Sequence, residues 1–217
     1  MNSRPQPWQG CALPLSYARA PVGLAPLAAP GGSAIIGDGS GDASVLLRRP
    51  GGGLVSEAQA RLFTRLEALG IASETVEHAP VFTVEEAQRL RGEIPGGHCK
   101  SLFLKDKKGG LWLVVADEAR AVDLKALAKQ LGAPRFSFGK PDLLREVLGI
   151  EPGSVTPFAL INDPGHRVTV VLDKAMLKQE RLNYHPLANT ATTTIASADL
   201  RAFIAACGHE TYITELD

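Results

Sequence analysis

The sequence predicts an α+β fold, in which several helices pack on a mixed β-sheet within a single domain. Capping-box patterns followed by apolar residues at helical spacing indicate helices. Short apolar runs separated by glycine-bearing loops indicate strands. Because helices and strands do not alternate strictly, a mixed sheet is favoured over a doubly wound parallel one.

Residues 1–54 differ in composition from the rest of the chain. They contain 10 of the 22 glycines and 7 of the 15 prolines, but no lysine, glutamate or histidine. Glycine raises the entropy cost of ordering the backbone and proline removes hydrogen-bond donors, so we expect this segment to be largely disordered. It is either a natural extension or the product of a misplaced start codon. The domain itself is expected to span residues 55–217.

The first predicted helix begins at a capping box. Ser56 and Gln59 have the S-x-x-Q spacing, and apolar residues follow at helical intervals until a glycine ends the helix. A short strand is expected over residues 74–77. A second capping-box pattern at residues 83–86 predicts another helix, which must end before Pro95.

Two apolar runs, residues 99–105 and 111–116, are joined by a loop with two glycines, which predicts a β-hairpin. The period of two places Lys100 on one face of the first strand and Cys99 on the other, so Cys99 is expected in the core. Helices are then expected at residues 124–131 and 142–148. The remaining predicted elements are strands at residues 158–162, 167–172, 192–195 and 210–214, and a helix at residues 197–207.

Composition excludes several classes of protein. The chain has 23 Lys+Arg and 23 Asp+Glu, and this balance argues against a protein that coats DNA or RNA by bulk electrostatics. No run approaches the ~18 consecutive apolar residues of a membrane span. The three cysteines lie far apart, which excludes a zinc ribbon or a disulfide framework and favours a reducing cytoplasm.

Lys100 is a candidate site residue because it enters an otherwise apolar strand. A lysine in this position either protects an edge strand against aggregation or directs a cation into a pocket. The loop at residues 149–157 holds two prolines and two glycines. Such a loop can expose backbone N–H groups to a carbonyl or a developing oxyanion, but the same composition is typical of an ordinary turn.

The polar stretch at residues 182–194 contains the third candidate, His185. Pro186 biases this histidine toward an extended conformation, so its ring can project from a strand end, while Asn189 and nearby threonines offer neutral hydrogen bonds. A purely structural histidine is the alternative. The threonines at residues 192–194 are also typical of an ordinary strand.

Taken together, these segments resemble the bacterial YbaK/ProX family, the freestanding homologues of the editing domain in bacterial prolyl-tRNA synthetases. The resemblance covers residues 56–216, and no motif covers residues 1–54. The motif at residues 185–192, HPLANTAT, is more similar to the ProX branch, which deacylates alanyl-tRNA(Pro), than to the YbaK branch, which removes cysteine. The motifs are HAPVFT at residues 78–83, KSLFL at 100–104, FSFG at 136–139, GSVTP at 153–157 and HPLANTAT at 185–192.

The resemblance implies a cytoplasmic aminoacyl-ester hydrolase that acts in trans on mischarged tRNA(Pro), with no metal, no cofactor and no covalent intermediate. It places Lys100 at the terminal adenosine and its phosphate, Gly153 in a G-x-x-x-P loop beside the aminoacyl group, and His185 in the pocket. These three are the expected catalytic residues. The expected substrate-binding residues are Phe82, Ser101, Ser154, Thr156, Pro157 and Asn189.

The absence of a catalytic triad agrees with this chemistry. An aminoacyl ester is an activated substrate, so a positioned water and stabilisation of the oxyanion are sufficient. The substrate's own 2′- or 3′-hydroxyl and backbone groups are expected to assist that water. The sequence has no G-x-S-x-G elbow and no signature of an activated thiol.

The expected partners are the acceptor end of tRNA(Pro) carrying alanine and prolyl-tRNA synthetase, with no membrane and no DNA. Two alternatives stay open at this point. The chain could remove cysteine from Cys-tRNA(Pro), as the YbaK branch does, with the same chemistry and a different size filter. It could also be a non-catalytic module that binds aminoacyl-tRNA or the synthetase, since a fold does not guarantee turnover.

Overall fold

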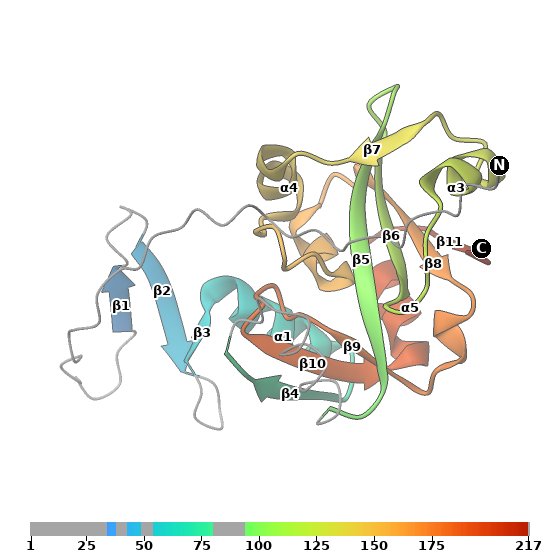
Figure 1. Cartoon of the computed structure of the whole chain (residues 1–217). Helices are drawn as coiled ribbons and strands as arrows, with labels where there is room; N and C mark the ends of the chain where they lie inside the picture. Colours follow the sequence, from blue (N-terminus) through green and yellow to red (C-terminus); the bar gives the residue numbers. More distant parts are fainter. Residues whose placement is uncertain (1–33, 38–42, 49–53, 80–93, 217) are drawn as a thin grey trace.

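The structure is a computed structural model, and it describes residues 34–37, 43–48, 54–79 and 94–216 (Figure 1). The helices of the described residues are α1 (Glu57–Ala68), α3 (Leu124–Gln130), α4 (Pro141–Leu148) and α5 (Ser197–Ala206), with the 3-10 helices η1 (Pro157–Asn162) and η2 (Met176–Lys178). The strands are β1 (Ala34–Gly37), β2 (Ala43–Arg48), β3 (Leu54–Ser56), β4 (Ser73–Glu77), β5 (Gly97–Asp106), β6 (Leu111–Asp117), β7 (Phe136–Phe138), β8 (Val168–Asp173), β9 (Arg181–Tyr184), β10 (Ala191–Ala196) and β11 (Thr211–Thr214).

The main sheet has eight strands and is mixed, as the sequence predicts. Seven of them follow the order β11-β8-β6-β5-β9-β10-β4, and β7 pairs with β5 as well. The pairs β6–β8, β8–β11 and β5–β9 are parallel, whereas β5–β6, β5–β7, β9–β10 and β10–β4 are antiparallel. The long strand β5 runs through the middle of this arrangement (Figure 1).

Strand β5 has two different partners on the side opposite β6. Strand β9 pairs with its start, at Gly97 and His98, and β7 pairs with its end, from Leu104 to Asp106. Lys100 lies in the stretch between these two pairings. Among the described residues, Lys100 itself is paired with Ala116 of β6 alone, so the protection of an exposed strand edge and the direction of a cation into a pocket both stay predictions.

Apolar side chains pack on both faces of the sheet. The larger core takes residues from α1, α4, α5, η1 and η2, and it includes the fully buried Phe158 and Phe203. The smaller core lies on the other face under α3, with Leu104, Leu127 and Phe136 among its members. Cys99 packs against the larger core, which confirms that it faces away from Lys100.

The predicted caps explain where the helices begin. The Ser56 hydroxyl accepts the N–H of Gln59 at 3.2 Å, and the Gln59 side chain accepts the N–H of Ser56 at 3.0 Å, which completes the capping box of α1. The Asp123 carboxylate accepts two N–H groups at the start of α3. Pro141 occupies the first turn of α4, and Gly149 ends that helix in the left-handed region.

Two expectations about secondary structure fail. Residues 158–162 do not form a strand; they form most of η1, because Pro157 suits the first turn and the Thr156 hydroxyl caps the N–H of Phe158. Strands β7 and β9 have no counterpart among the predicted elements. In β9, Leu182 and Tyr184 face the larger core and Asn183 lies on the other face, so polar and apolar residues do alternate, but β7 and β9 hold only three and four residues.

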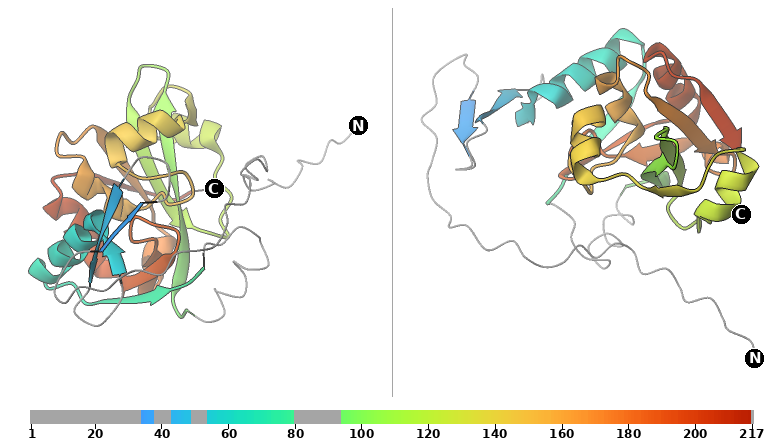
Figure 2. Two further views of the ribbon diagram at one scale, coloured as in Figure 1. Left: turned by 90° about the vertical axis from the view of Figure 1, so that its left-hand side faces the viewer. Right: turned by 90° about the horizontal axis from the view of Figure 1, so that it is seen from above.

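Near the N-terminus, β1, β2 and β3 form a small antiparallel sheet beside α1, away from the main sheet (Figures 1 and 2). β1 and β2 lie within residues 1–54, the segment whose composition predicts that it is largely disordered. The rest of that segment, the helix predicted from residue 83 onward and Phe82 lie outside the described residues. Among the described residues, no helix combines the length and apolar character needed to cross a lipid bilayer.

Candidate active site

The ammonium group of Lys100 is held at the end of the β5–β6 strand pair. It donates to the backbone carbonyl of Glu118 at 3.1 Å and also to the carbonyl of Arg120. Burial lowers the pKa of Lys100, and the nearby carboxylates of Glu118 and Asp117 oppose that shift. An ammonium has three N–H donors, and among the described residues these two carbonyls use two of them, which leaves one N–H for a substrate oxygen.

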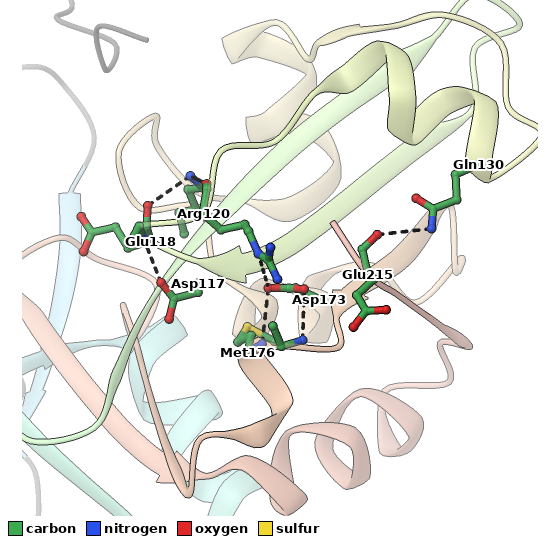
Figure 3. A network of polar contacts seen from close by, with 10 residues as sticks. Asp117, Glu118, Arg120, Gln130, Asp173, Met176 and Glu215 are labelled. Atoms are coloured by element: carbon green, nitrogen blue, oxygen red, sulfur yellow. Dashed lines mark hydrogen bonds and ion pairs between the residues drawn. The ribbon is translucent and has the colours of Figure 1, made fainter. Parts of the chain in front are cut away.

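The bend that supplies these carbonyls is itself fixed by an ion pair. The Arg120 guanidinium lies 3.7 Å from the Asp173 carboxylate, which is fully buried and also accepts the N–H groups of Ala175 and Met176 (Figure 3). Hydrogen bonds to a buried carboxylate are charge-assisted and therefore strong. Asp173 thus positions the bend from β8, and the bend positions Lys100.

His185 lies directly after β9, with its ring orientation set by the backbone. Its Nδ1 is 3.1 Å from the carbonyl oxygen of Ala191. A carbonyl can only accept, so Nδ1 carries the proton and Nε2 of the neutral ring is a hydrogen-bond acceptor. Burial, together with the neighbouring His78, lowers the pKa of His185 and favours this neutral form.

The turn that follows His185 is strained. Leu187 has φ +65, although it is not a glycine, and its N–H donates to the carbonyl of His185 at 3.0 Å. Such a conformation costs on the order of 1–3 kcal/mol and persists only where the surroundings enforce it. Here the Leu187 side chain is buried in the larger core, which holds the turn in place.

Lys100 and His185 each follow the parallel β5–β9 pairing by two residues. In that pairing His98 is opposite Asn183, and β9 ends at Tyr184, directly before His185. Glu118 interacts electrostatically with both of them. A cation, a neutral imidazole and a carboxylate therefore gather at one place.

Tyr184 joins this place to the loop at residues 153–157. Its ring is edge-on to Phe158, the residue after the loop, with centroids 5.7 Å apart. Its side chain also contacts the thiol of Cys99, the residue before Lys100. One buried tyrosine, directly before His185, thus fixes the three predicted site segments relative to one another.

Within the loop, Gly153 is exposed and has φ +91. Ser154, Thr156 and Pro157 are buried instead, and the Thr156 hydroxyl serves as the cap of η1. The N–H of Ser154 donates to the carbonyl of Glu151 at 3.0 Å, which closes a turn. Of the loop residues, the backbone at Gly153 is therefore best placed to meet a ligand from solvent, and substrate contacts of the three buried residues stay predictions.

We expect Gly153→Ala to lower the free energy of unfolding by about 1–2 kcal/mol, because a Cβ is unfavourable in left-handed backbone. The cause is backbone strain alone, since a Cβ at Gly153 would meet no atom within 4 Å. Urea unfolding of the full chain measures the change. Gly165→Ala is the matched control, because its Cβ would make only ordinary contacts, at 3.7 Å and beyond. Equal losses in both variants would contradict the assignment of strain to Gly153.

The remaining predicted site residues lie around this arrangement. Ser101 follows Lys100 on β5, is half-buried and points to the opposite face. Asn189 is half-buried in the connection between β9 and β10. Phe82 lies outside the described residues. The contacts of these three residues with substrate stay predictions.

Sequence reasoning missed several residues that build the site. His78, in the HAPVFT motif, lies with its ring centroid 6.5 Å from that of His185. Its Nδ1 donates to the carbonyl of Ala79 at 2.9 Å, so its Nε2 accepts from the Thr192 hydroxyl at 3.0 Å. Its place in a motif was the only available signal. Glu118 and Asp173 carried no signal, because their roles depend on which strands become neighbours.

The two thiols that the structure describes do not suit nucleophilic chemistry. Burial raises the pKa of Cys99 to about 12 and that of Cys207 to about 11, so both stay protonated near neutral pH.

In the described part of the chain, no group of three or more histidine, cysteine or acidic residues could hold a metal ion. The arrangement can bind an anionic or hydroxylated substrate at Lys100 and accept a hydrogen bond at His185.

The candidate site residues lie in a segment whose sequence is similar to that of known proteins. Residues 78–203, which include Lys100, Gly153 and His185, match the family model described as the aminoacyl-tRNA editing domain. The chain is 41% identical over 167 residues to prolyl-tRNA synthetase associated domain-containing protein 1 of Bos taurus, which covers 75% of this chain and 97% of the relative. It is 35% identical over 161 residues to the prolyl-tRNA editing protein ProX of Acetoanaerobium sticklandii. That match covers 74% of this chain and 98% of the relative.

A solved structure shows the same fold. It is named as a candidate trans-editing enzyme for prolyl-tRNA synthetase, and it superposes with a TM-score of 0.58. The match covers 75% of this chain and 98% of that chain at 23% sequence identity. The predicted editing-domain architecture is thereby confirmed.

Proposed function

The chain belongs to the aminoacyl-tRNA editing domain family, as a domain of the prolyl-tRNA trans-editing type, and we propose that it hydrolyses alanine from mischarged Ala-tRNA(Pro). The observation that carries this proposal is that Glu118 interacts electrostatically with both Lys100 and His185. A cation for the nucleotide and a neutral acceptor for the ribose or the ester are what such a reaction requires. We also propose the cytoplasm as its location and prolyl-tRNA synthetase as a partner.

Lys100 anchors the terminal adenosine. Its ammonium is oriented by two backbone carbonyls and keeps one N–H for a phosphate or ribose oxygen. Since the carbonyls belong to a bend held by Asp173, the cation does not need to be ordered when the substrate arrives. Preorganisation of this kind reduces the entropy cost of binding.

His185 orients the reacting end. Its Nε2 accepts a hydrogen bond from the free ribose hydroxyl, and that hydroxyl and the backbone at Gly153 hold the attacking water. The water oxygen bonds to the carbonyl carbon, the bond from that carbon to the ribose oxygen breaks, and the water proton passes to the ribose oxygen. The products are free alanine and tRNA with both terminal hydroxyls restored.

Selectivity follows from size. Proline is larger than alanine, and forcing a larger group into a packed pocket costs more free energy than a missing methylene loses. From the sequence, Phe82, Val84, Ser101 and Thr156 are the proposed residues of the pocket wall. Ser101 points to the face of β5 opposite Lys100, so it fits this role less well. Cysteine is closer to alanine in size, so the Cys-tRNA(Pro) activity of the sister branch is the second candidate.

The test is the rate of ester loss from alanyl-, cysteinyl- and prolyl-tRNA(Pro) with catalytic amounts of the full chain. We expect rapid multiple-turnover loss of alanine while prolyl-tRNA(Pro) is spared. Faster loss of cysteine than of alanine would assign the chain to the YbaK-like activity. Binding of all three substrates without loss from any would show a non-catalytic module.

A further inference from the structure

An apolar pocket opens beside Lys100, on the face of the sheet to which the Lys100 side chain points. Its volume is about 130 Å³, and its lining residues are Lys100, Leu102, Ala121, Val122, Leu124 and Phe138. The proposed chemistry uses only the ammonium group from this set. The five other side chains are apolar, and none of them has a role in the proposed chemistry.

Phe138 forms the rim of this pocket. It is 49% exposed, and it is one of only four large hydrophobic side chains that are exposed in the described part of the chain. In the β5–β7 pairing it lies opposite Leu104, so it shares a face with Leu102 and Lys100. The Phe138 ring is therefore exposed to solvent in the same pocket as Lys100.

Hydrogen bonds on both sides of Phe138 fix the strand that carries its ring. The Ser137 hydroxyl donates to the carbonyl of Lys105 at 3.2 Å, and the N–H of Gly139 donates to the carbonyl of Phe103 at 2.9 Å. Gly139 lies so close to the Phe103 ring that a Cβ there would approach it to 2.3 Å. Strand β7 is thus clamped on β5 on both sides of Phe138, and little order is lost when a ligand stacks on it.

A flat, apolar surface beside a cation suits a nucleotide, whose base has an aromatic face and whose sugar carries phosphate. We propose that the terminal adenine of the tRNA stacks on Phe138 between the apolar walls of this pocket, while Lys100 holds the ribose or its phosphate. This inference rests on the proposed function, because Lys100 belongs to both sites. It assigns Phe138 as a substrate-binding residue and Leu102 and Val122 as the walls of the base pocket.

The experiment measures the affinity of uncharged RNA hairpins that mimic the acceptor stem and end in CCA. One hairpin carries the terminal adenine and the other an abasic nucleotide in its place. Base stacking on an aromatic side chain contributes about 1–3 kcal/mol, so Phe138→Ala should weaken binding of the adenine hairpin by about 5- to 150-fold. On the abasic hairpin the same substitution should change the affinity by less than about 2-fold, because no base is left to stack.

Two further variants are matched controls. Phe138→Trp keeps an aromatic face and should restore most of the affinity. Tyr212→Ala removes an aromatic side chain that is 52% exposed on β11, at the far edge of the sheet, and should leave binding unchanged. An equal loss on the adenine and abasic hairpins after Phe138→Ala, or no loss on either, would overturn the proposal.

The outcome is independent of turnover, because the hairpins carry no ester. If the chain shows the stacking pattern but does not release alanine from Ala-tRNA(Pro), the base pocket stands and the proposed hydrolysis fails. If alanine is released but Phe138→Ala binds both hairpins as the wild type does, the hydrolysis stands and the base pocket fails. No detectable binding of either hairpin by the wild type would also overturn the base pocket.

Discussion

Lys100→Ala is expected to lower kcat/KM for Ala-tRNA(Pro) by about 10- to 150-fold, because a hydrogen bond to a charged group contributes about 1.5–3 kcal/mol. The loss should come mainly from KM, since Lys100 is assigned to anchoring the adenosine end. Deacylation rates over a range of substrate concentrations measure both parameters. A mobile surface lysine cannot take over this role, because two backbone carbonyls already hold the Lys100 ammonium in position.

Two variants separate this effect from a loss of folding. Lys100→Met keeps the apolar stem and removes the charge, so it should show the same loss of activity as Lys100→Ala with less change in thermal stability. Lys178→Ala removes an exposed lysine of η2 and should be neutral. Activity of Lys100→Ala equal to that of the wild type at subsaturating substrate would show that the anchoring role is wrong.

His185→Ala is expected to lower kcat by about 100-fold or more, the usual range for a side chain that takes part in positioning or transferring a proton. Its ring accepts at Nε2 only while it is neutral, and burial lowers its pKa below the ordinary value of about 6.5. The wild-type rate should therefore be constant at neutral pH and should fall as the pH drops through the depressed pKa. This acid limb should be absent from the residual activity of His185→Gln.

The same shift predicts an effect on stability. Since the folded-state pKa of His185 lies below the unfolded value, the neutral ring stabilises the folded state above about pH 6.5, and this contribution is lost as the pH falls toward the folded-state pKa. Urea unfolding at several pH values should show a smaller acid loss in His185→Gln. His166→Asn is the matched control, because His166 is exposed and asparagine tolerates its φ of +50. A pH profile changed equally by both substitutions would contradict the assignment to His185.

Local signals in the sequence predict most of the secondary structure because they act over a few residues. The capping box at Ser56, the cap at Asp123 and the proline at the start of α4 all determine helix ends as expected. The β5–β6 hairpin follows from its apolar runs and its glycine loop, which the Asp106 carboxylate closes. Residues 158–162 fail because a short apolar run has no period that separates a strand from a 3-10 helix.

The candidate site could be predicted only in part. Lys100, Gly153 and His185 are identified by their motifs, but the relation of Lys100 to His185 depends on the parallel pairing of β5 with β9, in which Gly97 is opposite Leu182, 85 residues later. No local pattern specifies that pairing. For the same reason Glu118, Asp173 and Tyr184 carry no signal, although they position the lysine and the histidine. The exposure of Phe138 likewise depends on where β7 joins β5.

The most direct test of a water-based hydrolysis at this site compares the wild type with the double variant Lys100→Ala/His185→Ala. Each protein is added in catalytic amounts to Ala-tRNA(Pro), and free alanine and intact tRNA are followed over time. The account predicts many turnovers by the wild type and release near the spontaneous rate by a folded double variant. Release at the wild-type rate by the double variant, or no release above background by the wild type, would contradict it.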